Sequence, residues 1–275
     1  MDFNLFIICF LTFIIHLIGT LAYSVRIAGI RTRKIAISFS MFNILILLSR
    51  TSNTFQLPFL AGRIEDNLKS NNGMPMGSSM LSDFHWLLFS ASLATIVGAF
   101  MIPSCQRFFS KAIFHFQKNR SIPKLILFCF TKKYSDVKEI CCLPTINNIT
   151  LLNSPHGVTK KILIMNVLAV SLWTVGVFAS MYAGYLNPEV RVTSSTLSSI
   201  INGFATIIMF IFIDPHLSMM TDDVVEGKMT DSQFRRSIVW LVGSRLGGTL
   251  LAHLLIVPAA TTIVFVAEII IKFKY

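Results

Sequence analysis

Charged residues are scarce in this sequence of 275 residues. Only 13% of them are Asp, Glu, Lys or Arg, and 53% are hydrophobic, whereas a soluble globular chain carries roughly 25% charged residues. Several apolar runs reach about 20 residues, the length that a helix needs to cross about 30 Å of hydrocarbon. The composition excludes an ordinary soluble domain and predicts a polytopic membrane protein.

The sequence also lacks the features of a signal peptide and of a disulfide framework. Its first 24 residues have no basic segment before the apolar run and no compact small-residue cleavage site, so we interpret them as a retained first span. The cysteines are odd in number and match no zinc-ligand spacing, so we expect free thiols. They are Cys9, Cys105, Cys129, Cys141 and Cys142.

The apolar runs predict one integral membrane domain over residues 1–275, an all-α bundle of about six transmembrane helices. The apolar tail after Pro258 leaves a short seventh span as an alternative. A continuous helix from Ile238 to Phe273 would be about 54 Å long, too long for one crossing, so we expect a bend near Pro258. The predicted spans are about 3–25, 35–60, 83–104, 162–186, 196–217 and 237–257.

Basic residues gather on one side of the predicted membrane. The turn 26–34 carries four, the segment 105–161 carries ten and the turn 218–236 carries three, against three between spans on the opposite side. The positive-inside rule therefore places both termini outside. Within 105–161 the basic residues alternate with Phe, Ile and Leu, which predicts interfacial amphipathic helices on anionic membrane lipids. We interpret the net charge of +11 as directed at the membrane and expect no nucleic-acid partner.

Small residues recur at four-residue spacing in three predicted spans. This pattern is typical of helices that pack closely in membranes, and it carries no information about a substrate. The residues are Ser90, Ala94 and Gly98, then Gly176, Ser180 and Gly184, and then Gly243 and Gly247.

Polar side chains lie inside several predicted spans, although a charge near the centre of a span is costly and usually serves a function. The second and sixth spans share the pattern S-R-x-x-x-T, for which an internal repeat and chance are equally good explanations. The candidates are His16 in the first span, Arg50, Asn53 and Gln56 in the second, and Ser244, Arg245, Thr249 and His253 in the sixth.

The arginines lie deep and lack acidic partners. Counted from the nearest cytoplasmic basic residue, Arg245 lies about 13 Å deep, His16 about 15 Å, and Arg50 and His253 about 24 Å. No predicted span has a carboxylate near its centre, and Asp214 lies at the inner edge. A buried guanidinium without a carboxylate needs carbonyls, water or an external anion. Because arginine grips phosphate bidentately, the pattern favours a phosphate-bearing substrate.

Each of these side chains also has a purely structural interpretation. Arg50 would snorkel to the outer surface if its span ended near Ser49, and Arg245 would bond the carbonyls of a neighbouring helix. His16 and His253 would be core histidines with satisfied hydrogen bonds.

Two other function classes remain open. A membrane enzyme acting on polyprenyl phosphates would resemble the phosphatidate phosphatases, but seven residues separate Arg245 from His253 and no Arg-Pro pair is present. Asp222, Asp223 and Glu226 would offer such an enzyme Mg²⁺ ligands, although a turn of mixed charge is usually only solvated. A non-transporting membrane scaffold is the other class. We predict no metal and no cofactor.

Two stretches carry a family resemblance: "LFIICFLTFIIHLIGTLAYSVRIAGIRTRKIAISFSMFNILILLSRTSN" and "RRSIVWLVGSRLGGTLLAHLLIVPAA". They resemble the Amj family of bacterial lipid II flippases, and the resemblance extends along the whole chain. It implies a transporter, not an enzyme, that moves lipid II from the inner to the outer leaflet of the bacterial cytoplasmic membrane. Lipid II is the undecaprenyl-pyrophosphate-linked peptidoglycan precursor, so its charge must cross hydrocarbon.

We therefore expect a cavity lined by the first, second and sixth spans, with Arg50 and Arg245 as phosphate ligands. Neutral hydrogen bonds to the sugar or pyrophosphate would come from Asn53, Gln56 and Thr249. The other candidate substrate-binding residues are Ser244, His16 and His253.

Overall fold

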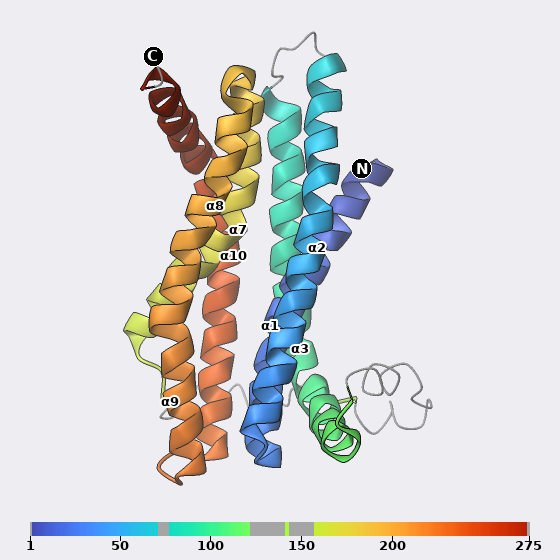
Figure 1. Cartoon of the computed structure of the whole chain (residues 1–275), viewed down its shortest axis with the longest axis vertical. Coiled ribbons are helices and arrows are strands. Elements are labelled where there is room, and N and C mark those ends of the chain that lie inside the picture. Colours follow the sequence, from blue (N-terminus) through green and yellow to red (C-terminus); the bar gives the residue numbers. More distant parts are fainter. Residues whose placement is uncertain (1, 71–76, 122–140, 143–156, 274–275) are drawn as a thin grey trace.

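The computed structural model describes residues 2–70, 77–121, 141–142 and 157–273, and within these ranges the chain forms helices and no strand (Figure 1). Six helical segments are long and apolar enough to cross a membrane, which confirms the predicted six-span all-α bundle. The helices are α1 (Phe3–Thr32), α2 (Ile35–Ser70), α3 (Gly77–Asn119), α7 (Lys160–Leu186), the 3₁₀ turn η2 (Pro188–Val190), α8 (Arg191–Ile208), the π-helical η3 (Met209–Ile213), α9 (Asp214–Val225) and α10 (Asp231–Lys272).

Local signals set two of the turns. Arg33 ends α1 in the left-handed conformation, with φ of 54°, and its backbone N–H bonds the carbonyls of Gly29 and Ile30. Thr230 begins α10 with a capping box, in which its hydroxyl and the Gln233 side chain bond each other's backbone N–H groups. These two turns lie at one end of the bundle and both chain termini lie at the other (Figure 1). Following the orientation predicted from the basic residues, we call these the inner end and the outer end.

Two prolines lie within long helices. Pro258 falls inside α10, and the C-terminal part of that helix leans away from the bundle, as expected from the bend (Figure 1). The tail is thus a continuation of the helix α10 and not a separate helix. Pro103 falls inside α3, and residues 105–119 of the basic segment continue that helix. The remainder of the predicted interfacial segment, 122–140 and 143–156 with Cys129, lies outside the described residues.

The helices form two units of three spans with the same packing pattern. α1 packs against both α2 and α3, and α7 packs in the same way against α8 and α10. Because consecutive spans alternate in direction, each helix of the second unit runs opposite to its counterpart in the first (Figure 1). This is the arrangement of inverted repeats in membrane transporters. The shared S-R-x-x-x-T pattern joins α2 to α10, which are not counterparts, so this repeat does not account for it.

Small residues allow close approach at several of the predicted positions. A Cβ added at Gly98 would come within 2.8 Å of Thr20 on α1, and one at Gly184 within 2.8 Å of Arg191. The sixth span agrees with the prediction at Gly247, where an added Cβ would lie 3.6 Å from Val167 of α7, and differs from it at Gly243. A Cβ at Gly243 would meet no atom within 4 Å, whereas one at Gly248 would lie 2.8 Å from the Val167 carbonyl. Gly248 therefore makes the α7–α10 contact, and Gly243 faces open space.

A hydrophobic core joins the two units at the outer end. Ile64 of α2 packs there in one cluster with Phe84 of α3 and Tyr182 of α7. The Phe84 and Tyr182 rings lie 5.4 Å apart. This apolar packing fills the outer half of the interface between the units, and cavities with several polar lining residues lie farther toward the inner end.

Candidate substrate cavity

A cavity of about 150 Å³ lies between the two units, on the inner side of the outer core. One wall is α2 and the opposite wall is α8 with η3, while α1, α7 and Arg245 of α10 complete the lining. The cavity is thus built from more spans than the first, second and sixth, because α7 and the α8–η3–α9 path also contribute. Its polar lining residues are His16, Tyr23, Arg26, Asn43, Ser49, Arg50, Thr174, Thr206, Asp214 and Arg245.

Arg26 and Asp214 form an ion pair at the inner end of the cavity. An Nη of Arg26 on α1 lies 3.0 Å from a carboxylate oxygen of Asp214, the first residue of α9, and Arg26 is only 5% exposed. Its guanidinium also lies over the rings of Phe39 and Phe42, at 4.9 and 4.7 Å. The Nε and the other Nη of Arg26 are buried and have no hydrogen-bond partner within the described residues.

Arg245 enters the cavity from α10. Its guanidinium lies against Gly19 of α1, so closely that a Cβ at position 19 would overlap it. The buried Nε of Arg245 has no hydrogen-bond partner in the part of the chain that the structure describes. A buried donor that the protein leaves unpaired indicates water or an anionic ligand at that position.

Arg50 lies on the α2 wall and is exposed. Its neighbour Ser49 fixes α2 against α1, because the Ser49 hydroxyl donates to the Ile15 carbonyl at 3.2 Å. Arg50 does not lie at a helix end, since α2 continues to Ser70. The structure thus brings Arg50, Arg245 and His16 to one cavity, together with Arg26.

A smaller polar cavity of about 30 Å³ continues the first one toward the outer end. It shares His16 with the larger cavity and is lined also by Asn53, Gln56 and Asn202. Gln56 is 2% exposed and donates to the Thr12 hydroxyl on α1. The His16 Nδ1 and the Asn202 side-chain oxygen are buried without a partner among the described residues. Such a volume has room for water.

Three other candidate residues lie away from both cavities. Ser244 accepts a hydrogen bond from the Asn166 amide at 2.7 Å and so supports the α7–α10 contact. Thr249 is fully buried and donates to the Leu246 carbonyl of its own helix. His253 faces His85 of α3, with 3.2 Å between the two Nδ1 atoms and nearly parallel rings.

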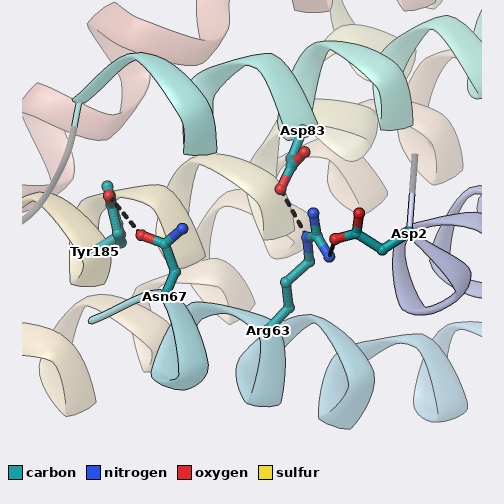
Figure 2. Close-up of polar contacts among 5 residues, drawn as sticks. All are labelled: Asp2, Arg63, Asn67, Asp83 and Tyr185. Carbon is teal, nitrogen blue, oxygen red and sulfur yellow. Dashed lines mark hydrogen bonds and ion pairs between the residues drawn. The ribbon is translucent and has the colours of Figure 1, made fainter. Parts of the chain in front are cut away.

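Polar contacts hold the outer end of the bundle together (Figure 2). Arg63 of α2 lies between two carboxylates, 2.7 Å from Asp83 of α3 and 3.0 Å from Asp2, which precedes α1. The Tyr185 hydroxyl of α7 donates to the Asn67 side-chain oxygen at 3.0 Å and thereby joins the second unit to the first (Figure 2). These contacts and the apolar core lie between the cavities and the outer end of the bundle.

Sequence reasoning missed two important members of the site, Arg26 and Asp214. The sequence pattern groups Arg26 with the basic residues of the turn 26–34, although it belongs to the buried last part of α1. Asp214 follows the π-helical turn η3 directly, and such turns frequently occur at functional sites. The described residues contain no group of three or more His, Cys, Asp or Glu that would hold a metal ion.

The inverted units and the arginine-lined cavity between them place this chain in the class of multi-pass membrane transporters. The chain belongs to the Amj family, described as "Alternate to MurJ", whose sequence profile matches residues 11–267. It is 35% identical to a protein of Bacillus subtilis (strain 168) named "Lipid II flippase Amj" over 266 residues, 96% of each chain. No solved structure matches the chain significantly. The family resemblance seen in the sequence is confirmed, and the chain is a multi-pass protein of the bacterial cytoplasmic membrane.

Proposed function

We propose that this chain moves lipid II from the inner to the outer leaflet and binds its pyrophosphate in the cavity between the two units. The observation that carries the proposal is the convergence of Arg26, Arg50 and Arg245 from three helices on one cavity. Asp214 is the one carboxylate among the described residues that line it. With His16 neutral, these four residues leave a formal charge of +2. A pyrophosphate diester carries one negative charge on each phosphate, so the two charges balance.

The buried guanidinium atoms support this role. Moving a pyrophosphate through hydrocarbon without partners would be prohibitively costly. The unpaired Nε atoms of Arg26 and Arg245 offer charge-assisted hydrogen bonds that would replace lost hydration. Asp214 holds Arg26 in place when substrate is absent and would release it when the pyrophosphate binds.

The sides of the cavity suit a substrate whose tail stays in the bilayer. The outward surfaces of its walls carry exposed apolar side chains, such as Leu47 and Leu48 on α2 and Ile200 and Phe204 on α8. The polyprenyl chain would remain in hydrocarbon beside these helices while only the polar headgroup enters the cavity. Asn53 and Gln56 of the smaller cavity would then offer hydrogen bonds along the outward path.

The size of the cavity requires a change of conformation. At about 150 Å³ it is smaller than the roughly 300 Å³ of the smallest typical ligand pockets. The two units must therefore move apart to admit a muropeptide headgroup. Rocking of inverted units about a central site is the usual solution in transporters, and it would require the Tyr185–Asn67 contact at the outer end to open.

The test is a flipping assay in liposomes that contain this protein alone, with fluorescent lipid II in both leaflets and a membrane-impermeant quencher outside. We expect accelerated exchange with the wild type and a loss of more than ten-fold with Arg26→Gln or Arg245→Gln. Arg31→Gln is the matched control, because Arg31 is exposed and lies outside both cavities. Equal rates in liposomes with and without the protein would contradict the proposal. Release of inorganic phosphate would favour a polyprenyl-phosphate enzyme instead.

A further inference from the structure

A second concave surface lies between α3 and α10. These helices touch in the outer half, where His85 meets His253, and they diverge toward the inner end. The space between them is a groove of about 500 Å³, which we call the lateral groove. Ile27 of α1 contributes to its floor. The groove is larger than the substrate cavity and shares none of its lining residues.

The lateral groove changes from polar to apolar along its length. Its inner end is lined by Ser232, Arg235, Arg236 and Gln106, and the remainder mainly by apolar side chains up to Leu246. From Ser232 to Leu246 the groove follows α10 for about 21 Å at 1.5 Å per residue. One bilayer leaflet with its headgroups is about 20 Å thick. The groove therefore has the length and polarity of a single phospholipid that stands in the inner leaflet.

The polar end of the groove is cationic, and the described residues provide it with no acidic partner. No Asp or Glu is among the described residues that line it. Arg235 is exposed, and its Nε donates to the Asp231 backbone carbonyl at 3.3 Å. The Nε of Arg236 is buried without a hydrogen-bond partner in the described part of the chain. A lipid phosphate between the two guanidinium groups would satisfy both, as in other basic pockets between membrane helices.

We propose that the lateral groove binds one anionic phospholipid of the inner leaflet, with the phosphate on Arg235 and Arg236 and an acyl chain between α3 and α10. Gly243 supports this assignment, because it lines the groove and an added Cβ there would meet open space. The occupant is distinct from the transported lipid. The substrate cavity is lined by α2 and by α8 with η3, none of which contributes to the groove, so a tail bound there would lie beside other helices.

Native mass spectrometry of the purified full-length protein tests whether the groove prefers an anionic headgroup. Phosphatidylglycerol and phosphatidylcholine with the same acyl chains are titrated, and the dissociation constant of the first bound lipid is measured for each. We expect a preference for phosphatidylglycerol, which the Arg235→Gln, Arg236→Gln variant loses by about 30-fold. The control Arg31→Gln, Lys34→Gln removes two positive charges at the same end of the bundle and should retain the preference.

A second variant tests whether an acyl chain lies between α3 and α10, and it leaves the charge of the protein unchanged. Gly243→Leu places a side chain in the groove and should remove the tight site for phosphatidylglycerol. Gly203→Leu on α8 is its control, since an added Cβ there also meets no atom within 4 Å and Gly203 lies outside the groove. Gel filtration and the melting temperature verify that each variant folds.

Three results would overturn the proposal. They are equal affinity of the wild type for both phospholipids, unchanged phosphatidylglycerol binding in both groove variants, and one-for-one displacement of the bound phospholipid by undecaprenyl pyrophosphate. The last result would assign the groove to the substrate. The binding measurement does not depend on transport, so its outcome is separate from that of the flipping assay.

Discussion

Arg26 and Asp214 are 188 residues apart in sequence and form a 3.0 Å ion pair between α1 and α9. The pair joins the two three-helix units at the inner end, as the Tyr185–Asn67 hydrogen bond joins them at the outer end. It also gives Arg26, the most buried arginine of the cavity, a partner for its charge. A substrate anion that displaced Asp214 would therefore both bind Arg26 and loosen the inner contact between the units.

Variants of this pair are expected to change the stability of the protein and its flipping rate in different ways. Arg26→Gln leaves the Asp214 carboxylate unpaired, and Asp214→Asn leaves a buried guanidinium unpaired, so each single variant should lower the melting temperature. The double variant Arg26→Gln, Asp214→Asn should recover part of that loss, with a coupling of about 1–3 kcal/mol. Flipping should not recover, because the double variant lacks the Arg26 guanidinium that binds the phosphate. Recovery of both properties together would show that Arg26 has only a structural role.

The two arginines found by sequence are expected to depend on their shape as well as their charge. Arg50→Gln and Arg245→Gln should fold, since an amide is less costly to bury than an unpaired charge, and should lose flipping. Lysine at either position keeps the charge but loses the planar fork, so its rate should lie well below that of the wild type. Rates are compared per folded protein in liposomes. Wild-type activity in the double Gln variant would refute the anion-binding role.

Gly19 is expected to set the position of Arg245. A methyl group there overlaps the guanidinium and must displace it, so Gly19→Ala should reduce flipping several-fold. Alanine favours a helix over glycine, and a loss of stability should therefore not accompany the change. Gly203→Ala is the matched control, because its methyl group meets no neighbour. Equal flipping by the two variants would mean that the Arg245 position is unimportant.

The outer contacts are expected to open during transport. In a background without native cysteines, Asn67→Cys and Tyr185→Cys joined by a short bifunctional thiol reagent should abolish flipping, because the two units can no longer separate there. Reduction of a cleavable linker should restore it. The pair Asn67→Cys, Ser70→Cys lies on α2 alone and should remain active after the same treatment. Transport through the cross-linked outer contact would contradict rocking of the units.

The orientation of the bundle is expected to follow the basic residues. In intact cells, Arg31→Cys and Lys228→Cys at the inner end should be shielded from an impermeant thiol reagent, whereas Asp66→Cys and Glu189→Cys should react. All four positions are exposed in the structure. Labelling at position 31 from outside would show that the bundle has the opposite orientation. That result would also contradict the proposed direction of transport.

The sequence by itself determined the class of fold and the family. Crossing hydrocarbon requires a run of about 20 apolar residues, so each span is visible in the sequence before any tertiary contact is known. The bend at Pro258 and the unusual arginines Arg50 and Arg245 are also visible in the sequence, because each is a local feature. A proline interrupts the hydrogen bonding of a helix, and a charge stands out in an apolar run.

Only the tertiary structure decided which polar groups share a site. Hydropathy reports how deep a residue lies but not the direction in which its helix turns it, and that direction is fixed by packing against neighbours. Ser244 and Arg245 are adjacent, yet Ser244 faces α7 and Arg245 the cavity. Arg26 looked like a surface cation of a turn and is buried against Asp214. Their pairing arises from the meeting of α1 and α9, which no local pattern in the sequence records.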